Sequence, residues 1–512
     1  AMSLISTRFF LFLLGTVIFY YVVPKRAQWM LLLLASGVFY LFSGLANVLF
    51  LLFSVSTFYG CARWTERLLK DGSPEKKNLA KRLLALVIIV NFGVLALFKL
   101  ENEATAWLQP LALRLGLATD TGGLLLPLGI SFYMFQGTGY LLDVYRGKIT
   151  PQKNYAKFAL FISFFPQVVQ GPISRFDCLS DQLTSQREFD YGRVRRAAQL
   201  ILYGCFKKLV IADNIAPFTG SVFSGAAEQP GAMVALACVL GTLQLYCDFS
   251  GGIDVASGVA EMFGIALPEN FRQPYFARSL AEYWRRWHIT LNEWWREYLF
   301  FPITLSRPMN RLSRFLRKHV GGGAGKIISV YVGILVVRVA NSCWHGLNFN
   351  HLMSGAYFSV LMIAALALRD PLYKLTKRMR IPTESFGWRL FQMGRTFLIL
   401  CLNRVFFMTK DISSAFGALG NLFGGIRLID LRNGALYANS LTHLAIGVIA
   451  AGICVIFTVD ILHERGVKIR DRLEKSPAAL SWMLMLAVIF AALVFGGYGA
   501  AYNAQDFIYT RF

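Results

Sequence analysis

Three polar residues recur along one face of an apolar stretch in the second half of the chain. Residues 327–344 are predominantly apolar, yet Arg338, Asn341 and His345 follow one another at spacings of three and four residues. In a helix these spacings place all three side chains on one face. Ionisable groups inside a membrane are costly and usually face a cavity, so this face is a candidate functional site.

His345 is the candidate catalytic base of this group. A neutral imidazole with an unperturbed pKa of about 6.5 suits proton abstraction near neutral pH. Asn341, one helical turn earlier, is predicted to orient the imidazole or to donate a hydrogen bond to an oxyanion, and Arg338 is a second candidate for the oxyanion. The competing interpretation is a buried structural histidine. Cys343 would point away from His345 on a helix, which favours ordinary packing over a nucleophilic role.

A second histidine, His288, lies in an aromatic stretch that also reads as a helix. Its apolar residues recur at three- and four-residue spacing, which predicts an amphipathic helix rather than a membrane span. His288 is expected below His345, near the cytoplasmic surface, where it could relay a proton, contact a bound substrate or pack beneath the site. The predicted buried stripe consists of Trp284, Trp287, His288, Leu291, Trp295 and Tyr298.

The opposite face of this stretch is basic. Arg285 and Arg296 turn away from the predicted stripe, and Arg286 lies beside them. The three arginines are candidates for binding the phosphate groups of a ligand. A basic cytoplasmic face also occurs without any ligand, so both interpretations stay open.

Other chemistries find no support in the sequence. There is no Gly-x-Ser-x-Gly motif, and the glycine-rich run 321–326 lacks the Ser or Thr that a phosphate-binding loop needs, because Ile327 follows it. The eight cysteines show no CxxC pattern and no metal-ligand spacing, so no metal site is predicted.

The composition indicates an all-α polytopic membrane protein. The 512 residues are 55% hydrophobic and only 16% charged, which is too apolar for a soluble core of this length. The net charge of +23 resides in short clusters between apolar runs, where the positive-inside rule explains it without a nucleic-acid partner. No repeat or soluble domain interrupts the chain, which predicts one membrane domain over residues 1–512, with membrane lipids around it.

Hydropathy and charge predict twelve membrane crossings with both termini outside. Residues 155–173 break the alternation because basic segments flank them on both sides, and we predict a re-entrant hairpin that turns at Pro166 or at Pro172 with Gly171. The predicted spans are residues 4–23, 29–43, 47–62, 83–100, 123–142, 197–212, 232–263, 327–344, 352–368, 390–408, 441–462 and 481–497.

Two carboxylates fall inside the predicted span 232–263. Asp248 and Asp254 need partners or water at membrane depth. The countercharge could come from Lys207 and Lys208, or from Arg272 and Arg286, and the sequence leaves both pairings open.

At these residues the chain resembles the membrane-bound O-acyltransferase family, and within it the bacterial alginate O-acetyltransferase branch. The resemblance covers roughly residues 4–512 and rests on several motifs in a fixed order. These motifs are Leu126-Pro127-Leu128-Gly129-Ile130-Ser131-Phe132-Tyr133 with Phe135-Gln136, Phe164-Phe165-Pro166-Gln167 with Gly171-Pro172-Ile173, Asp248-Phe249-Ser250-Gly251, Asn270-Phe271 with Pro274-Tyr275, Trp284-Arg285-Arg286-Trp287-His288-Ile289, and Trp344-His345-Gly346.

The resemblance implies that His345 is the catalytic histidine, that His288 is the second histidine of the family pattern, and that a central funnel joins a cytoplasmic acyl donor to an outer acceptor. It implies acetyl-CoA as the donor, whose phosphates Arg285, Arg286 and Arg296 could bind and whose thioester His288 could contact, with no permanently bound cofactor. It further implies a bacterial cytoplasmic (inner) membrane location, an exported polysaccharide such as an alginate-like or cellulose-like glycan, and a secreted or periplasmic esterase-like acetyltransferase as partner. Residues 265–326 are then a cytoplasmic amphipathic and basic segment.

The C-terminal tail, residues 499–512, carries one more part of the resemblance. Its last residues, Phe507-Ile508-Tyr509-Thr510-Arg511-Phe512, are similar to the aromatic-x-Tyr-x-x-aromatic tail of this branch, in which the tyrosine is proposed to carry the acyl group. The tail is predicted to lie outside, and Tyr509 is a candidate relay. The alternative is an aromatic anchor at the membrane interface.

Two other functions compete with acetyl transfer. One is a D-alanyl transferase of the teichoic-acid type, which would use a carrier-protein thioester. The other is a membrane transporter whose polar stripe conducts a solute. Replacement of His345 by Ala separates enzyme from transporter, because a transporter could keep its flux.

Overall fold

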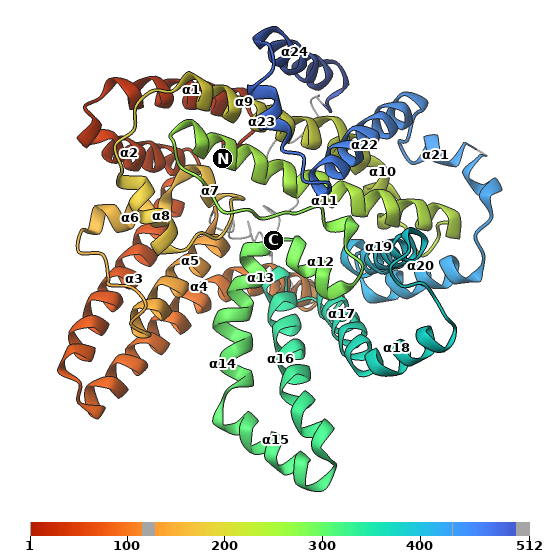
Figure 1. Ribbon diagram of the computed structural model, residues 1–512, viewed down its shortest axis with the longest axis horizontal. Helices are drawn as coiled ribbons and strands as arrows, with labels where there is room; N and C mark the ends of the chain where they lie inside the picture. Colours follow the sequence, from red (N-terminus) through yellow and green to blue (C-terminus); the bar gives the residue numbers. More distant parts are fainter. Residues whose placement is uncertain (1, 115–127, 433, 498–512) are drawn as a thin grey trace.

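The computed structural model describes residues 2–114, 128–432 and 434–497, and within them the fold is helical (Figure 1). Phe271 and Trp287 form an isolated antiparallel β-bridge there. Long apolar segments become helices because a helix satisfies every backbone N–H and C=O internally, which lipid requires. The all-α class predicted from composition is therefore confirmed.

The first four helices form one side of the molecule, drawn in red and orange in Figure 1. Ser6 caps the first of them by accepting a hydrogen bond from the Phe9 N–H. Gly72, at φ 75°, ends the third helix in the left-handed region, where glycine has no steric penalty. The elements are α1 (Thr7–Val22), η1 (Lys25–Ala27), α2 (Gln28–Leu41), α3 (Leu45–Asp71) and α4 (Pro74–Arg114).

Short, broken helices follow in the region predicted as a re-entrant hairpin. The helix is interrupted at Phe164 and again after Val168, and the segment between these two breaks is fully buried. Its backbone finds partners in other elements, since the Phe165 N–H donates to Ser36 and the Ile173 N–H donates to Thr290. The elements are α5 (Ile130–Tyr145), α6 (Tyr155–Ser163), α7 (Phe165–Val168) and α8 (Phe176–Thr184).

The long helix α11 (Gly231–Met262) crosses the centre of the molecule (Figure 1). It packs against α9 (Tyr191–Cys205), the π-helical turn η2 (Phe206–Ala212) and α10 (Asp213–Ser224). Glycines permit the close approach, because a Cβ on Gly204 would lie 2.5 Å from the Gly251 carbonyl oxygen. This packing brings Lys207 and Lys208 against the carboxylates of α11.

The stretch around His288 is not one continuous helix, contrary to the sequence prediction. A helix ends at Arg286 and the next begins at Ile289, with His288 at φ 44° between them. The cause is a backbone contact: the Arg272 N–H donates to the Arg286 carbonyl, and the Ile289 N–H donates to the Asn270 carbonyl. The elements are η3 (Pro274–Phe276), α12 (Leu280–Arg286), α13 (Ile289–Trp295), η4 (Arg296–Phe300) and α14 (Phe301–Thr304).

The predicted stripe is nevertheless buried. Trp287, His288, Leu291, Trp295 and Tyr298 are buried and Trp284 is partly buried, whereas Arg285, Glu293 and Arg296 are exposed.

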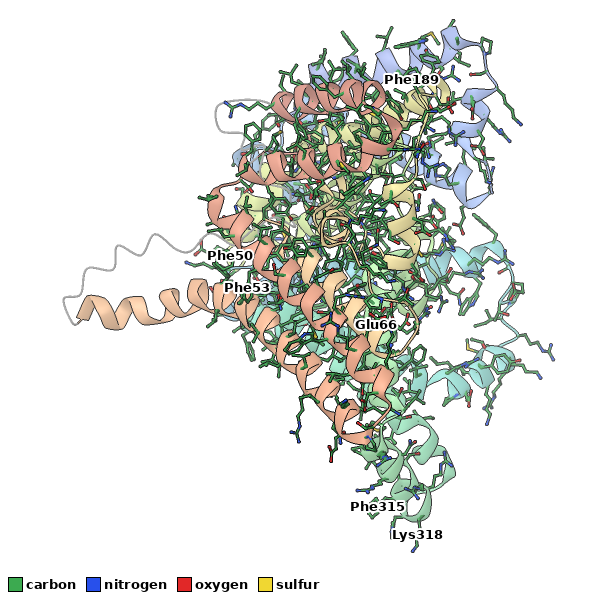
Figure 2. The ribbon with its side chains drawn as sticks, turned by 90° about the vertical axis from the view of Figure 1, so that its left-hand side faces the viewer. Phe50, Phe53, Glu66, Phe189, Phe315 and Lys318 are labelled. Atoms are coloured by element: carbon green, nitrogen blue, oxygen red, sulfur yellow. The ribbon has the colours of Figure 1, made fainter. Side chains whose placement is uncertain are left out.

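A basic helix projects from the body next in the chain. The part of the predicted cytoplasmic basic segment before α16 (Gly322–His345) contains α15 (Arg307–His319), whose tip Figure 2 marks with Phe315 and Lys318. Ser306 caps it by accepting from the Met309 N–H. It packs on α16, the helix that ends at the candidate catalytic histidine.

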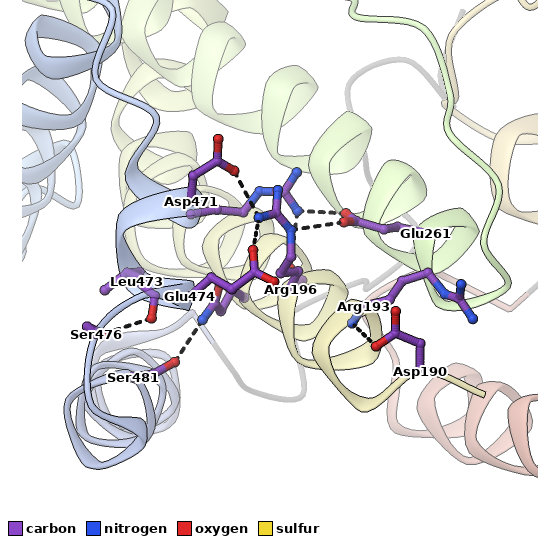
Figure 3. A network of polar contacts seen from close by, with 11 residues as sticks. Asp190, Arg193, Arg196, Glu261, Asp471, Leu473, Glu474, Ser476 and Ser481 are labelled. Carbon is purple, nitrogen blue, oxygen red and sulfur yellow. Dashed lines mark hydrogen bonds and ion pairs between the residues drawn. The ribbon is translucent and has the colours of Figure 1, made fainter. Parts of the chain in front are cut away.

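The remaining helices complete the bundle. An ion-pair network at Arg196 of α9 joins the last helices to the centre, with contacts to Glu261, Asp471 and Glu474 (Figure 3). The elements are α17 (Phe349–Ala367), α18 (Arg369–Arg378), α19 (Phe386–Met408), α20 (Ile412–Gly424), η5 (Leu428–Leu431), α21 (Ala435–Ala438), α22 (His443–Glu464), α23 (Ile469–Glu474) and α24 (Ala478–Phe495).

Eight helices of the described chain are long and apolar enough to cross a membrane. They are α3, α4, α11, α16, α17, α19, α22 and α24, whereas α1, with 16 residues, is shorter. The predicted count of twelve is thus not confirmed, because α2 and α5 also fall short of the ~20 residues that a span needs and η2 interrupts the stretch 197–212. The chain is a multi-pass membrane protein.

Candidate active site

Several segments of the chain meet around a cavity of ≈ 70 Å³. They come from α11, η3, the α12–α13 region, α16, α17 and α19, and the labelled helices among them lie near one another in Figure 1. The polar and charged side chains in its lining are Thr242, Tyr275, Tyr283, His288, Asn292, Arg338, Asn341, Ser342, His345, His351, Ser354, Asn403 and Arg404.

The face predicted on α16 points into this cavity. Arg338, Asn341 and His345 all line it, together with Ser342. Cys343 is absent from the lining, as the helical geometry predicts. The shared face is confirmed; the catalytic roles of these residues stay predictions.

His345 occupies the last turn of α16, where the rings of Trp344, His351 and Phe407 lie near its imidazole. The ring centroids of Phe407 and His351 lie 5.4 and 6.2 Å from that of His345. A Cβ on Gly346 would lie 2.7 Å from Nδ1 of His351. The glycine that follows the histidine therefore lets α17 bring His351 close to the cavity.

His288 reaches the same cavity from the α12–α13 break. The indole of Trp344 contacts both histidines. Its ring centroid lies 6.4 Å from that of His288 and 4.6 Å from that of His345. The ring of Phe249 on α11 meets His288 edge-on at 4.8 Å. Both histidines therefore line one cavity.

The hydrogen bond of His288 fixes its tautomer. Nδ1 lies 3.1 Å from Oδ1 of Asn270, and this amide oxygen also accepts from the backbone N–H and the hydroxyl of Thr290. An oxygen that accepts these bonds requires the proton on Nδ1, which leaves Nε2 as the acceptor nitrogen. Burial lowers the pKa of His288 to about 3, so the ring stays neutral at physiological pH.

Two buried arginines also line the cavity. The Arg338 guanidinium carbon lies 4.0 Å from the ring centroid of Trp284, and that of Arg404 lies 4.8 Å from the ring centroid of Phe407. Sequence reasoning missed Arg404, Asn403 and His351. The available signal was Arg404 itself, an ionisable residue inside the apolar run 390–408.

The three arginines proposed for coenzyme A do not share one environment. Arg286 forms ion pairs with Glu282 and Glu464. Arg285 and Arg296 are exposed and make no ion pair with any residue that the structure describes. None of the three lines the histidine cavity. Tyr509 lies outside the described residues.

The carboxylates of α11 pair with the two lysines of η2 rather than with the arginines. Lys207 contacts Asp254 at 2.5 Å and donates to Ser250, while Lys208 contacts Asp248 at 2.6 Å and Asp213 at 2.8 Å. Lys207 and Asp254 line a second cavity of ≈ 890 Å³ between α9, α11 and the C-terminal helices. Neither His288 nor His345 lines it, but Asn270 does.

Comparisons with known proteins give a consistent picture. Residues 152–317 match the model of the membrane-bound O-acyltransferase family. The chain is 32% identical over 424 residues to the probable alginate O-acetylase of Pseudomonas syringae pv. tomato, covering 81% of this chain and 74% of the relative. It is 29% identical over 389 residues to the peptidoglycan O-acetyltransferase of Helicobacter pylori, covering 69% and 67%.

A more distant similarity joins the chain to D-alanyl transfer. The teichoic acid D-alanyltransferase of Streptococcus thermophilus is 25% identical over 250 residues, which cover 48% of this chain and 57% of the relative.

Proposed function

Because the chain belongs to the membrane-bound O-acyltransferase family, and is therefore an acyltransferase, we propose that it moves acetyl groups from cytoplasmic acetyl-CoA for O-acetylation of an exported polysaccharide. The alginate and peptidoglycan O-acetyltransferases among its relatives support O-acetylation of a polysaccharide by this membrane protein. The observation that carries the proposal is the meeting of His345, His288, Asn341 and Arg338 around one buried cavity.

The chemical step assigns the proton to His345. Its imidazole takes the proton of the acceptor hydroxyl while the hydroxyl oxygen attacks the thioester carbonyl carbon. The tetrahedral intermediate then collapses with cleavage of the C–S bond. The imidazolium returns the proton to the departing thiolate, so that an acetyl ester, coenzyme A thiol and neutral His345 result.

Asn341 and Arg338 act on the charge that develops in this step. Both line the cavity from the helix that carries His345. A hydrogen bond from the Asn341 amide and the positive charge of Arg338 stabilise the oxyanion, and they do so strongly because the site is buried. His288 acts as a neutral hydrogen-bond acceptor through Nε2, since its low pKa makes it a poor base.

The small volume of the cavity supports transfer through an intermediary. A space of ≈ 70 Å³ suits an acetyl group and a hydroxyl, not a polysaccharide chain. In this proposal the acetyl group passes to Tyr509 of the C-terminal tail and then to a secreted or periplasmic esterase-like acetyltransferase, which acetylates the glycan. The protein resides in the bacterial inner membrane, and Arg285 and Arg296 bind the coenzyme A phosphates on its cytoplasmic side.

The ester groups on the exported glycan test this function. Cells that lack the chromosomal copy receive the wild-type chain or the His345→Ala variant, and the ester groups on the polysaccharide are identified by mass spectrometry. We expect acetyl esters with the wild type and none with the variant at equal membrane abundance. Glycan acetylation that persists with His345→Ala contradicts the proposal, and D-alanyl esters in place of acetyl esters identify the competing transferase.

The relay through Tyr509 has its own test. The acylated peptide that contains Tyr509 should accumulate when acetyl-CoA is supplied and the partner is absent, and it should not accumulate with Tyr509→Phe. An unmodified tyrosine under turnover conditions contradicts the relay but leaves acetyl transfer by His345 intact.

A further inference from the structure

Two arginines line the cavity that His345 also lines. Arg338 and Arg404 line it from two different helices, α16 and α19. No Asp or Glu occurs among the described residues of its lining. Guanidinium groups in the wall of a buried cavity act on a charged ligand more strongly than they would in water, because the effective dielectric constant is lower there.

The surroundings of Arg338 indicate which sign of charge a ligand in this cavity would carry. Arg338 is only 7% exposed and lines the cavity. Among the described residues it makes no hydrogen bond or ion pair and instead stacks on Trp284 at 4.0 Å. A buried guanidinium without a counterion favours a group that is negative or becomes negative during the reaction.

The second arginine lies near the reacting position. The ring of Phe407 is 4.8 Å from the Arg404 guanidinium carbon and 5.4 Å from the His345 ring. An acyl carbon within reach of His345 is therefore close to one arginine and shares a small cavity with the other. At about 10 Å and an effective dielectric constant of about 20, one like charge disfavours binding by about tenfold.

We propose that Arg338 and Arg404 make this cavity selective for acyl groups without positive charge, so that it admits acetyl and excludes aminoacyl groups such as D-alanyl. This inference rests on the proposed function, since it assumes that acyl transfer takes place at His345. The same two charges stabilise the tetrahedral oxyanion and disfavour an ammonium beside the carbonyl carbon. Selectivity thus arises from repulsion of the wrong donor as well as attraction of the developing charge.

A pair of isosteric donors tests the proposal. Propionyl-CoA and glycyl-CoA have acyl groups of nearly the same size, but glycyl carries an ammonium in place of the terminal methyl group. At about pH 6.5 the amine is protonated, since α-amino groups have pKa values of about 7.7–8.0. The readout is the ratio of their inhibition constants against acetyl-CoA, measured with the full chain in proteoliposomes. Inhibition measures binding of a donor even when its acyl group is too large to be transferred.

In the wild type we expect the inhibition constant of propionyl-CoA to be at least about tenfold lower than that of glycyl-CoA. It should shrink in the double variant Arg338→Gln and Arg404→Gln, and remain in Arg338→Lys, which keeps the charge. Arg389→Gln is the matched control, because Arg389 lies on the same helix as Arg404, outside the cavity, in an ion pair with Glu384.

Equal inhibition by the two donors in the wild type overturns the inference, whatever the variants do. If acetyl transfer itself is absent from an intact, reconstituted wild type, the proposed function fails instead. Acetyl transfer with no preference between propionyl and glycyl donors leaves the function standing and removes the charge selectivity.

Discussion

The imidazole of His288 and the amide of Asn270 form a buried hydrogen bond, with Nδ1 of the histidine 3.1 Å from Oδ1 of the asparagine. Asn270 lines the larger cavity and His288 lines the smaller one. The pair therefore stands between the two cavities, and it fixes the histidine tautomer at the site.

Replacement of Asn270 should disturb both stability and activity. Asn270→Ala leaves three donors without their acceptor: Nδ1–H of His288 and the N–H and hydroxyl of Thr290. A buried donor that loses its acceptor costs about 1–3 kcal/mol. We expect a lower unfolding temperature in detergent together with slower acyl transfer. Asn270→Asp keeps an acceptor oxygen and is the comparison; equal thermal stability of wild type and Asn270→Ala contradicts this account.

The pH dependence of stability should contain a contribution from His288. Its folded-state pKa of about 3 lies below the ordinary value of 6.5. Between these values the unfolded chain binds the proton and the folded chain does not, so the free energy of unfolding falls as pH decreases. The slope is on the order of 1.4 kcal/mol per pH unit.

Thermal unfolding of wild type and His288→Gln in detergent measures this contribution. From about pH 6.5 to about pH 5 the wild type should lose on the order of 2 kcal/mol more than the variant. Parallel pH profiles of the two proteins would mean that the imidazole is accessible to protons in the folded state.

His345→Ala should lower acyl transfer by at least about a hundredfold, because a general base contributes roughly 10²–10⁴ in rate. His443→Ala is a suitable control, since His443 is exposed at the start of α22 and lies outside the cavity. The measurement is release of coenzyme A thiol from acetyl-CoA by each purified variant. A similar loss in both variants would point to a general effect of histidine removal.

Lys208→Met should strongly destabilise the centre of the bundle. Lys208 lies between Asp248 and Asp213 with its side chain 4% exposed. Removal of one partner from a buried ion pair costs about 3–5 kcal/mol because a carboxylate stays buried without its countercharge. Lys76→Met breaks an exposed pair with Asp71 and should cost about 0–1 kcal/mol. Unfolding temperatures in detergent compare the two, and similar values contradict the structural role of Lys208.

The arginines near His288 should separate into two groups. Arg285→Gln and Arg296→Gln are expected to raise KM for acetyl-CoA, since each removes an exposed charge that can bind phosphate. Arg286→Gln should instead lower stability, because Arg286 ties α12 to Glu464 of α22. Steady-state kinetics and thermal unfolding of the three variants distinguish these effects. A KM unchanged in Arg285→Gln and Arg296→Gln would place the donor phosphates elsewhere.

The sequence by itself determined the helical membrane class and the face of α16 that carries Arg338, Asn341 and His345. Both follow from local rules, since apolar length and helical periodicity act over a few turns of one chain segment. The same rules predicted twelve spans, a count that the structure does not confirm, and a continuous helix through His288. The break at His288 depends on backbone hydrogen bonds to Asn270 and Arg272, which no periodicity within the helix contains.

Tertiary structure alone decided which partners meet. It paired Lys207 and Lys208 with the carboxylates of α11. It also brought Arg404 and His351 to the cavity of His345 from helices that follow later in the chain. These choices depend on how helices far apart in sequence pack, through close contacts such as Gly204 against Gly251. Local sequence fixes the face that a helix presents, but it does not specify which charge lies opposite.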